Sequence, residues 1–257
     1  MEPAGQGVSV RPKPAIGEQN MKIAMWSGPR NLSTAMMYAF GARTDCAVID
    51  EPFYAAYLAM TGLHHPMREE VLAAQSQDPG QVAAMLSGPN PGARPFWYQK
   101  HMTQHMIPGI PRDWMRSVCN VFLIRHPARV IASYAEKREN PTLEDIGFRQ
   151  QAELFDEVSG WGGDPLVIDS HDIREDPARM LERLCDRIGV PWSPHMLSWP
   201  KGGHKDDGVW ARHWYGAVWN STGFAGPEGD LPEVPEALQP VLQAAMPFYE
   251  RMRAVKI

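Results

Sequence analysis

The sequence predicts an α/β protein in which three layers, α/β/α, are built around a central, mostly parallel sheet. Short apolar runs alternate with segments of helical periodicity along most of the chain. The first unit consists of an apolar run at 22–26, a helical segment at 33–40 and a second apolar run at 46–50. A helix between two short strands implies that the strands are parallel and that helices cover the sheet. A chain of 257 residues is long enough to fill such a core.

The same alternation continues after this unit. The segments expected as strands are 96–100, 118–125 and 166–170. The segments expected as helices are 128–137, 142–159 and 177–188. Thr142 and Asp145 form a predicted capping box, while Asp176-Pro177 and Gly189 mark the two ends of the later helix. The stretch 235–252 is helical in character, but Pro240 and Pro247 are expected to break it.

Three segments depart from the alternation. Residues 1–20 are polar and rich in Pro and Gly, and they lack an apolar core, so they predict a disordered tail rather than a secretion signal. Prolines and glycines interrupt the helical pattern of residues 53–95, which predicts an insertion of short helices, suited to a lid over a site. Residues 191–224 hold five of the nine tryptophans and predict an irregular covering arm. Residues 21–257 are therefore expected to form a single domain.

Composition excludes several classes of protein. The 25 Lys and Arg residues against 30 Asp and Glu residues leave a net charge of −5, which argues against bulk binding of nucleic acid. No apolar run approaches the roughly 18 residues that a membrane span needs. Three widely spaced cysteines, an odd number, argue against a disulfide framework and for a reducing compartment, the cytoplasm. The absence of a CxxC pair excludes a zinc ribbon.

The loop after the first predicted strand has the composition of an anion-binding site. It reads Ser27-Gly28-Pro29-Arg30-Asn31-Leu32-Ser33-Thr34 and leads into a helix N-terminus, where backbone N–H groups are free. Arg30 adds a forked cation, and the hydroxyls of Ser33 and Thr34 either bind a phosphate or cap the helix. No lysine precedes Ser33 or Thr34, so the GxxxxGK[ST] signature is absent and magnesium-ATP bound in the usual P-loop manner is disfavoured.

A second candidate anion site follows the strongest predicted strand. Arg125 stands at the carboxyl end of that strand, where open α/β sheets bind their ligands. Ser133 follows eight residues later, two turns into a predicted helix, where its hydroxyl reaches toward the same anion. Taken alone, this pair is equally compatible with a salt bridge and an ordinary helical serine.

Together the two segments resemble the sulfotransferase superfamily, whose members use 3′-phosphoadenosine 5′-phosphosulfate (PAPS). Residues 29–34 are similar to its P-[KR]-[SG]-G-[ST]-[ST] motif, and residues 125–133 fit its R-[DH]-P-x-x-x-x-x-S motif. Residues 172–189 are similar to the family's E-D-L-x-x-D-P segment and the helix after it. The resemblance covers about residues 21–191. It implies a P-loop-like sulfotransferase fold and metal-free transfer of a sulfuryl group from PAPS to a hydroxyl or amine of a small-molecule acceptor.

The resemblance also assigns binding roles. The residues it places at the 5′-phosphosulfate are Pro29, Arg30, Asn31, Leu32, Ser33 and Thr34. Arg125 and Ser133 would bind the 3′-phosphate. Leu32 stands where the family usually has glycine, so a positive φ at this position would strain it. The Arg-Lys-Gly triplet of animal cytosolic members is missing, and only Lys201-Gly202 and Lys205 lie in the comparable region.

Three residues are candidates for the base that takes the acceptor's proton. Glu51 ends the second strand and matches the catalytic glutamate of bacterial and heparan-type sulfotransferases. His101 follows the third predicted strand and is similar to the histidine of cytosolic members, displaced by one position. His105 is the third candidate and would share a helical face with His101. Lys100 is either a second cation at the bridging oxygen or a solvated residue at the strand end.

Two further interpretations of the residues stay open. In the arm, Trp210 and Trp214 either stack on adenine or pack in the interior. For the whole chain, the alternatives to a sulfotransferase are a small-molecule kinase on a related P-loop scaffold and a non-catalytic nucleotide-binding protein. The missing Walker lysine and the pair Arg125 and Ser133 count against the kinase.

Overall fold

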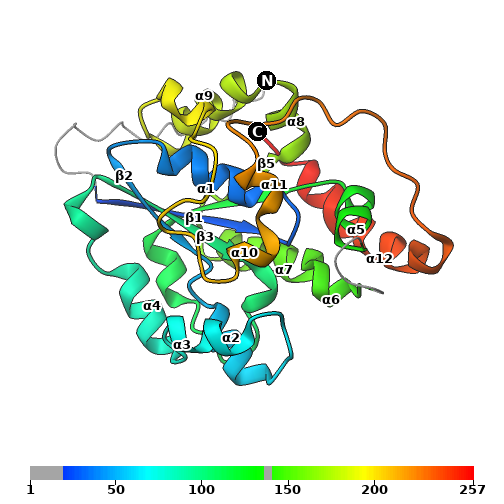
Figure 1. Ribbon diagram of the computed structural model, residues 1–257, viewed down its shortest axis with the longest axis horizontal. Coiled ribbons are helices and arrows are strands. Elements are labelled where there is room, and N and C mark those ends of the chain that lie inside the picture. Colours follow the sequence, from blue (N-terminus) through cyan, green and yellow to red (C-terminus); the bar gives the residue numbers. More distant parts are fainter. Residues whose placement is uncertain (1–19, 136–140) are drawn as a thin grey trace, which may run out of the picture.

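The computed structural model describes residues 20–135 and 141–257 and confirms the predicted α/β class, with helices on both faces of a five-stranded sheet (Figure 1). The strands are β1 (Met21–Ser27), β2 (Cys46–Asp50), β3 (Phe96–Met102), β4 (Cys119–Ile124) and β5 (Leu166–Asp169). All pairings are parallel and the strand order is β2-β3-β1-β4-β5. The tail predicted over 1–20 falls, except for residue 20, outside the described residues.

The strand order creates a switch point at the middle of the sheet. From β1 the chain passes to the edge strand β2, returns to β3 between β2 and β1, and then crosses to β4 and β5 on the other side of β1. The loops that follow β1 and β4 therefore leave neighbouring strands at the same end. In open parallel sheets this crevice, beyond the carboxyl ends of the strands, is where ligands bind.

Side chains alternate between two cores, one on each face of the sheet. Ile23 and Met25 of β1 face one core, while Ala24 and Trp26 face the other. The first core is covered by α1 (Ser33–Gly41), α8 (Ser170–Glu175) and α9 (Pro177–Ile188). The second is covered by α4 (Pro79–Ser87), α5 (Pro127–Ala135), α7 (Phe148–Gly160) and α12 (Gln239–Arg253). Figure 1 shows α1, α8 and α9 on one side of the sheet and α4 and α7 on the other.

Two helix predictions were wrong in detail. The single helix predicted over 142–159 is two helices, α6 (Leu143–Ile146) and α7, because Gly147 takes a left-handed φ of 71° between them. The capping box of Thr142 and Asp145 is present at the start of α6. Helix α12 is not broken by its prolines. Pro240 lies in the first turn of the helix, where a backbone N–H has no intrahelical partner to lose. Pro247 has no N–H to donate to the carbonyl of Gln243, but both residues lie on the exposed side of the helix, where water can reach that carbonyl.

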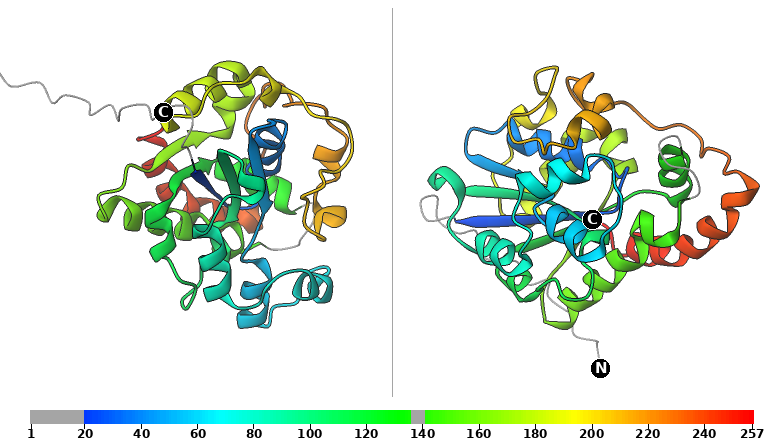
Figure 2. Two further views of the ribbon diagram at one scale, coloured as in Figure 1. Left: turned by 90° about the vertical axis from the view of Figure 1, so that its left-hand side faces the viewer. Right: turned by 60° about the horizontal axis from the view of Figure 1, so that its bottom comes forward.

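The insertion and the arm meet above the carboxyl end of the sheet. Residues 53–95 form the predicted short helices: α2 (Tyr54–Thr61), α3 (Arg68–Ala74), α4 and a 3-10 turn at Pro91–Ala93. The arm at 191–224 contains only a 3-10 turn at Pro194–Leu197 and two single-turn helices, α10 (Ala211–Trp214) and α11 (Gly216–Trp219). Trp210 and Tyr215 of the arm pack with Tyr54 and Leu58 of α2 in a third apolar cluster. Figure 2 shows the arm passing outside α1 before it reaches this cluster.

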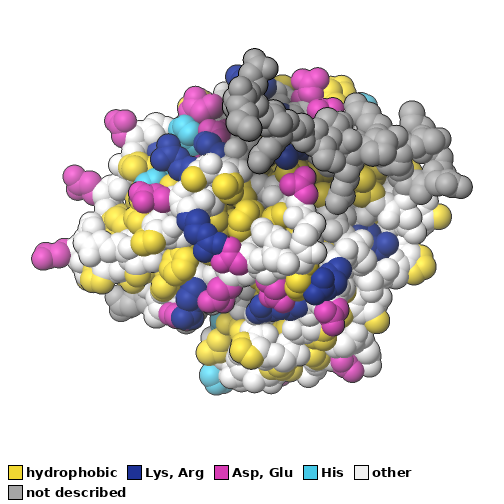
Figure 3. Space-filling model, turned by 180° about the vertical axis from the view of Figure 1, so that it is seen from behind, with side chains coloured by type: hydrophobic (Ala, Val, Ile, Leu, Met, Phe, Trp, Pro, Cys, Tyr) yellow, Lys and Arg dark blue, Asp and Glu magenta, His cyan; other side chains and the backbone are white. Residues whose placement is uncertain are grey.

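One face of the molecule carries side chains of mixed character. On the face in Figure 3, basic and acidic side chains are mixed with apolar ones rather than gathered by charge. No helix within 20–135 or 141–257 is long and apolar enough to cross a membrane. Cys46, Cys119 and Cys185 are all free thiols.

Candidate active site

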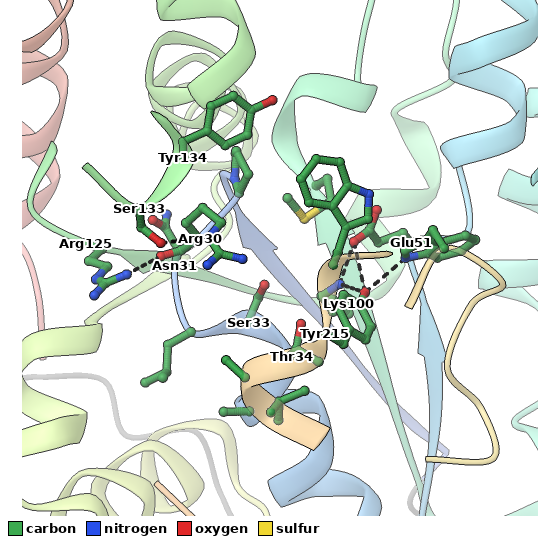
Figure 4. A pocket seen from close by; sticks show the side chains of 18 of the residues that line it. Arg30, Asn31, Ser33, Thr34, Glu51, Lys100, Arg125, Ser133, Tyr134 and Tyr215 are labelled. Carbon is green, nitrogen blue, oxygen red and sulfur yellow. Dashed lines mark hydrogen bonds and ion pairs between the residues drawn. The ribbon is translucent and has the colours of Figure 1, made fainter. Parts of the chain in front are cut away.

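A cavity of about 320 Å³ lies at the carboxyl end of the sheet, beneath the arm. Its walls include every residue predicted to bind the nucleotide: Pro29, Arg30, Asn31, Leu32, Ser33, Thr34, Arg125 and Ser133. Glu51, Lys100 and His105 also line it, but His101 does not. Figure 4 shows Arg30, Arg125 and Ser133 at one end of the cavity and Glu51, Lys100 and Tyr215 at the other. Ser33 and Thr34 lie between the two groups.

The loop between β1 and α1 is held in an unusual backbone conformation. Arg30 and Leu32 have φ values of 61° and 69°. Leu32 therefore has the positive φ that strains a residue other than glycine. Together with Glu51, φ 42°, they are three of the five non-glycine residues with positive φ in the described chain. Such conformations cost roughly 1–3 kcal/mol each and gather at ligand sites. All three line the cavity.

The N-terminus of α1 carries no side-chain cap. Leu32 is the capping residue and makes no capping bond, so the alternative in which Ser33 caps the helix is wrong. Ser33 is instead the first residue of the helix. The first N–H groups of an α-helix have no intrahelical partner, and the positive end of the helix dipole attracts anions. The N-terminus of α1 therefore faces the cavity as an anion-binding element.

Hydrogen bonds join the two predicted anion sites. Arg30 donates from Nε to Oγ of Ser133 at 2.9 Å, and a guanidinium nitrogen of Arg125 donates to the backbone carbonyl of Arg30 at 2.6 Å. These contacts follow from the switch point, because β1 and β4 are neighbours and their following loops lie together. Arg30, Arg125 and Ser133 thus form one site at one end of the cavity.

At the other end, Lys100 is the centre of a buried polar cluster. Its Nζ donates to Oδ1 of Asp50 at 2.8 Å, to Oε1 of Glu51 at 2.6 Å and to the Tyr215 hydroxyl at 2.6 Å. The Tyr215 hydroxyl in turn donates to Asp50 and accepts from Nε1 of Trp210 at 3.0 Å. Lys100 is only 1% exposed, so its description as a solvated strand-end residue was wrong.

Burial shifts the ionisation of this cluster. Desolvation raises the pKa of the Glu51 carboxyl, and the ammonium of Lys100 offsets this only in part. For Lys100, burial opposes the charged form, but the carboxylates of Asp50 and Glu51 outweigh it, so the pKa is raised. Lys100 therefore stays protonated, and Glu51 becomes a stronger base than an exposed glutamate.

His101 and His105 were predicted to share one helical face, and this prediction was wrong, because the first lies in a strand and the second in a 3-10 turn. His101 belongs to β3, so its side chain points to the face of the sheet opposite that of Lys100. It stacks on Trp26 with ring centroids 4.4 Å apart, and burial lowers its pKa to about 3. His105 ends a 3-10 turn and stacks between Tyr54 and Tyr57. Burial also lowers the pKa of His105 well below its usual range.

Aromatic groups surround the Glu51 end of the cavity. The side chains in question are Tyr54, His65, His105, Trp210 and Trp214. Trp210 is buried and packs edge-on against Tyr54 at 5.1 Å between ring centroids. It serves as a packing residue in this arrangement, and a stacking role for Trp210 or Trp214 on adenine stays a prediction.

Sequence reasoning missed several residues of the site. Asp50 stands at the carboxyl end of β2, next to Glu51, and the rule that placed Glu51 also applies to it. His65 was not among the candidates, yet it lines the cavity, and its Nδ1 lies 2.9 Å from the Tyr54 hydroxyl. Tyr215 comes from the arm, where no periodicity or motif singles out one aromatic residue.

A parallel sheet with an anion-binding loop and helix N-terminus at its switch point defines a phosphate-binding type of α/β protein. The chain matches the family described as "Sulfotransferase domain" over residues 21–256 and belongs to that family. This confirms the resemblance drawn from the two motifs and makes sulfuryl transfer the general activity that the family supports.

Solved structures show the same fold. The sulfotransferase domain of the olefin synthase from Synechococcus PCC 7002 aligns with a TM-score of 0.55, at 16% identity, over 94% of this chain and 98% of that one. A sulfotransferase from Alicyclobacillus acidocaldarius aligns with a TM-score of 0.52, at 12% identity, over 93% and 96%. At these identities the likeness concerns the fold alone.

Curated relatives in Arabidopsis thaliana are more similar in sequence. Branched-chain-amino-acid aminotransferase-like proteins 1 and 2 are 34% and 32% identical to this chain over 233 and 232 residues. The alignments cover 90% of this chain but 41% of each relative. The chain thus spans about two-fifths of the length of these proteins, and the activity of the whole relatives does not follow for it.

Proposed function

We propose that this protein transfers the sulfuryl group of PAPS to a hydroxyl of a small-molecule acceptor. One observation carries the proposal: the guanidinium groups of Arg30 and Arg125 line one cavity, with the buried carboxyl of Glu51 at its far end. A doubly phosphorylated adenosine offers one anion for each arginine, and the acceptor oxygen would then lie toward Glu51.

In this proposal the two arginine sites divide the nucleotide between them. Arg125 and Ser133 bind the 3′-phosphate, and Arg30 binds the 5′-phosphate together with Ser33, Thr34 and the uncapped N-terminus of α1. The cations and N–H groups around the 5′-phosphate also stabilise the negative charge that this phosphate gains as the leaving group. Residues 29–34 need no metal ion for this role.

Transfer proceeds by in-line displacement. The bond from the acceptor oxygen to sulfur forms while the bond from sulfur to the bridging oxygen breaks, and 3′-phosphoadenosine 5′-phosphate leaves. The acceptor's hydroxyl proton passes to Glu51, whose pKa is raised by burial and whose Oε1 accepts a hydrogen bond from Lys100. All three N–H donors of the Lys100 ammonium are used in hydrogen bonds to Asp50, Glu51 and Tyr215, so Lys100 acts by orienting Glu51.

The surroundings of Glu51 favour an acceptor with an apolar or aromatic body. Tyr54, Trp210 and Trp214 line this end of the cavity, with Tyr54 and Trp210 buried and Trp214 partly exposed. Such surfaces bind flat apolar molecules better than sugars, whose hydroxyls need polar partners. The arm that carries both tryptophans also shields the site from water, which would otherwise hydrolyse the activated sulfate.

A thermal-shift titration tests the donor. Saturating 3′-phosphoadenosine 5′-phosphate, at about 100 times its dissociation constant, is expected to raise the melting temperature by about 5–10 °C, whereas ATP with magnesium is expected to leave it unchanged. The reverse result supports a small-molecule kinase on a related scaffold. If neither nucleotide stabilises the protein, the proposal is contradicted, and a non-catalytic protein is favoured instead.

A further inference from the structure

Three arginines converge on one buried carboxylate next to the cavity. Arg125 lies 2.5 Å from Oε1 of Glu228, Arg174 lies 3.0 Å from the same oxygen, and Arg129 lies 3.1 Å from Oε2. The Glu228 side chain is only 2% exposed. The three cations come from separate parts of the fold: the end of β4, helix α5 and helix α8. We call Arg125, Arg129 and Arg174 the arginine clamp.

One carboxylate does not balance the clamp. Three guanidinium charges and one carboxylate leave two positive charges in excess within this group. Burial lowers the pKa of Arg125, and the positive charges of Arg174 and Arg129 lower it further, while the carboxylate of Glu228 raises it. The repulsion among the three arginines is therefore only partly offset by Glu228. A phosphate monoester carries about 1.5 to 2 negative charges at pH 7 and three acceptor oxygens, which matches three forked cations better than a single carboxylate does.

The clamp opens into the same cavity as Arg30 and Ser133. Arg125 and Arg174 both line that cavity, and Ser133 is bonded to Arg30 within it. An anion held by the clamp would therefore lie beside the site already assigned to the 3′-phosphate. Glu228 now fills this position with its own carboxylate.

Glu228 is carried by a segment with no regular secondary structure of its own. Between α11 and the 3-10 turn at Glu236–Leu238 the described chain has no helix or strand (Figure 1). The clamp itself holds this segment: Arg174 donates to the carbonyl of Gly226 at 2.7 Å, and Arg129 donates to the carbonyls of Glu228 and Gly229. Gly229 adopts a φ of 67°, and because glycine has no Cβ, other backbone conformations are also open to it at little steric cost.

We propose that Arg129 and Arg174 join Arg125 in binding the 3′-phosphate, and that Glu228 is an internal anion that fills the clamp until the nucleotide displaces it. This inference rests on the proposed use of a 3′-phosphorylated nucleotide. Binding of the nucleotide then releases residues 226–229 from the clamp, so part of the binding free energy is spent on exchanging one anion for another.

Calorimetric titration with two nucleotides tests the clamp. The probes are 3′-phosphoadenosine 5′-phosphate and 5′-AMP, which lacks the 3′-phosphate. Arg129→Gln and Arg174→Gln are each expected to weaken the first by about tenfold or more, and to leave 5′-AMP unchanged. Glu228→Gln is expected to tighten binding of the first severalfold, again without effect on 5′-AMP. Arg183→Gln on α9 and Glu233→Gln, both exposed, are the matched controls.

Limited proteolysis of the wild-type protein with a glutamyl endopeptidase provides a second measurement that needs no variant. The 3′-phosphorylated nucleotide is expected to speed cleavage after Glu228, because it releases this segment from the clamp, and 5′-AMP is expected to leave that cleavage unchanged. If Glu228→Gln weakens binding of the 3′-phosphorylated nucleotide, or that nucleotide slows cleavage after Glu228, Glu228 is not a displaced anion. If the arginine variants do not change the preference over 5′-AMP, the clamp does not bind the 3′-phosphate. Failure of the wild-type protein to bind either nucleotide would instead overturn the proposed function.

Discussion

Lys100 and His101 are neighbours in the chain, yet only one of them belongs to the cavity. Because successive side chains of a strand point to opposite faces, a shift of one residue moves a side chain from the site into the core on the other face of the sheet. Lys100 reaches Glu51, whereas His101 is enclosed by Trp26, Phe53 and Trp114. At the residue scale, Glu51 is therefore the candidate base with access to an acceptor, and His101 has a packing environment.

The base is tested by replacing its carboxyl. Glu51→Gln keeps the shape but takes no proton, so kcat is expected to fall by about 10²- to 10⁴-fold. In the wild-type protein, kcat/KM is expected to rise with pH through a midpoint above 4.5, because burial raises the pKa of Glu51 and only the deprotonated form is active. The variant should lack this acid limb. The measurement is release of 3′-phosphoadenosine 5′-phosphate from PAPS with a panel of phenols and alcohols.

Glu236→Gln, an exposed residue outside the cavity, is the control for this change. Near-normal turnover of Glu51→Gln would remove Glu51 as the base. The role would then pass to His105, the candidate histidine that lines the cavity, and His105→Phe, which keeps a ring against Tyr54 and Tyr57, would abolish turnover.

At the scale of elements, apolar runs predicted the strands better than periodicity predicted the helix ends. The predicted strands agree with β1 to β5 within about two residues, because each is a short run buried on both faces. The division of 142–159 into two helices depends on Gly147, and nothing in the local pattern distinguishes this glycine from one inside a helix. The continuity of α12 depends on exposure of Pro247, which only the tertiary structure decides.

Gly147 links the helices to the anion loop. An added Cβ would lie 2.6 Å from Oγ1 of Thr103 and 3.5 Å from Cα of Gly28, and φ is 71°. Gly147→Ala is therefore expected to lower the free energy of unfolding by about 1–3 kcal/mol. Gly160→Ala at the end of α7, where an added Cβ meets nothing within 4 Å, is expected to be neutral or slightly stabilising. Urea unfolding of the two variants checks this, and equal stabilities would contradict the role given to Gly147.

At the scale of the whole molecule, the parts of the site that follow from topology were predictable and the parts from the arm were not. Arg30, Glu51 and Arg125 all follow strands, and parallel strands bring their carboxyl ends to one edge. Tyr215 and Glu228 lie in segments without periodicity, and Tyr215 is 115 residues away from Lys100 in the chain. Their positions depend on how the arm and the segment after it fold back over the sheet, which involves long-range packing rather than local pattern.

Tyr215 is one of the polar links between the arm and the sheet, beside the bond from the N–H of Gly208 to Oδ2 of Asp50. Its hydroxyl contacts Asp50, Glu51 and Lys100, all of them buried, so its loss would leave charged groups short of a partner. Tyr215→Phe is therefore expected to lower the free energy of unfolding by about 1–3 kcal/mol. The matched control is Tyr98→Phe, because Tyr98 is also buried and its hydroxyl has no hydrogen-bond partner among residues 20–135 and 141–257. That variant should be neutral or more stable, since it removes an unsatisfied polar group. Urea unfolding of both variants at pH 7 measures the difference. Equal losses would mean that the Tyr215 hydroxyl does not stabilise the arm, and that the cluster around Lys100 serves only to orient Glu51.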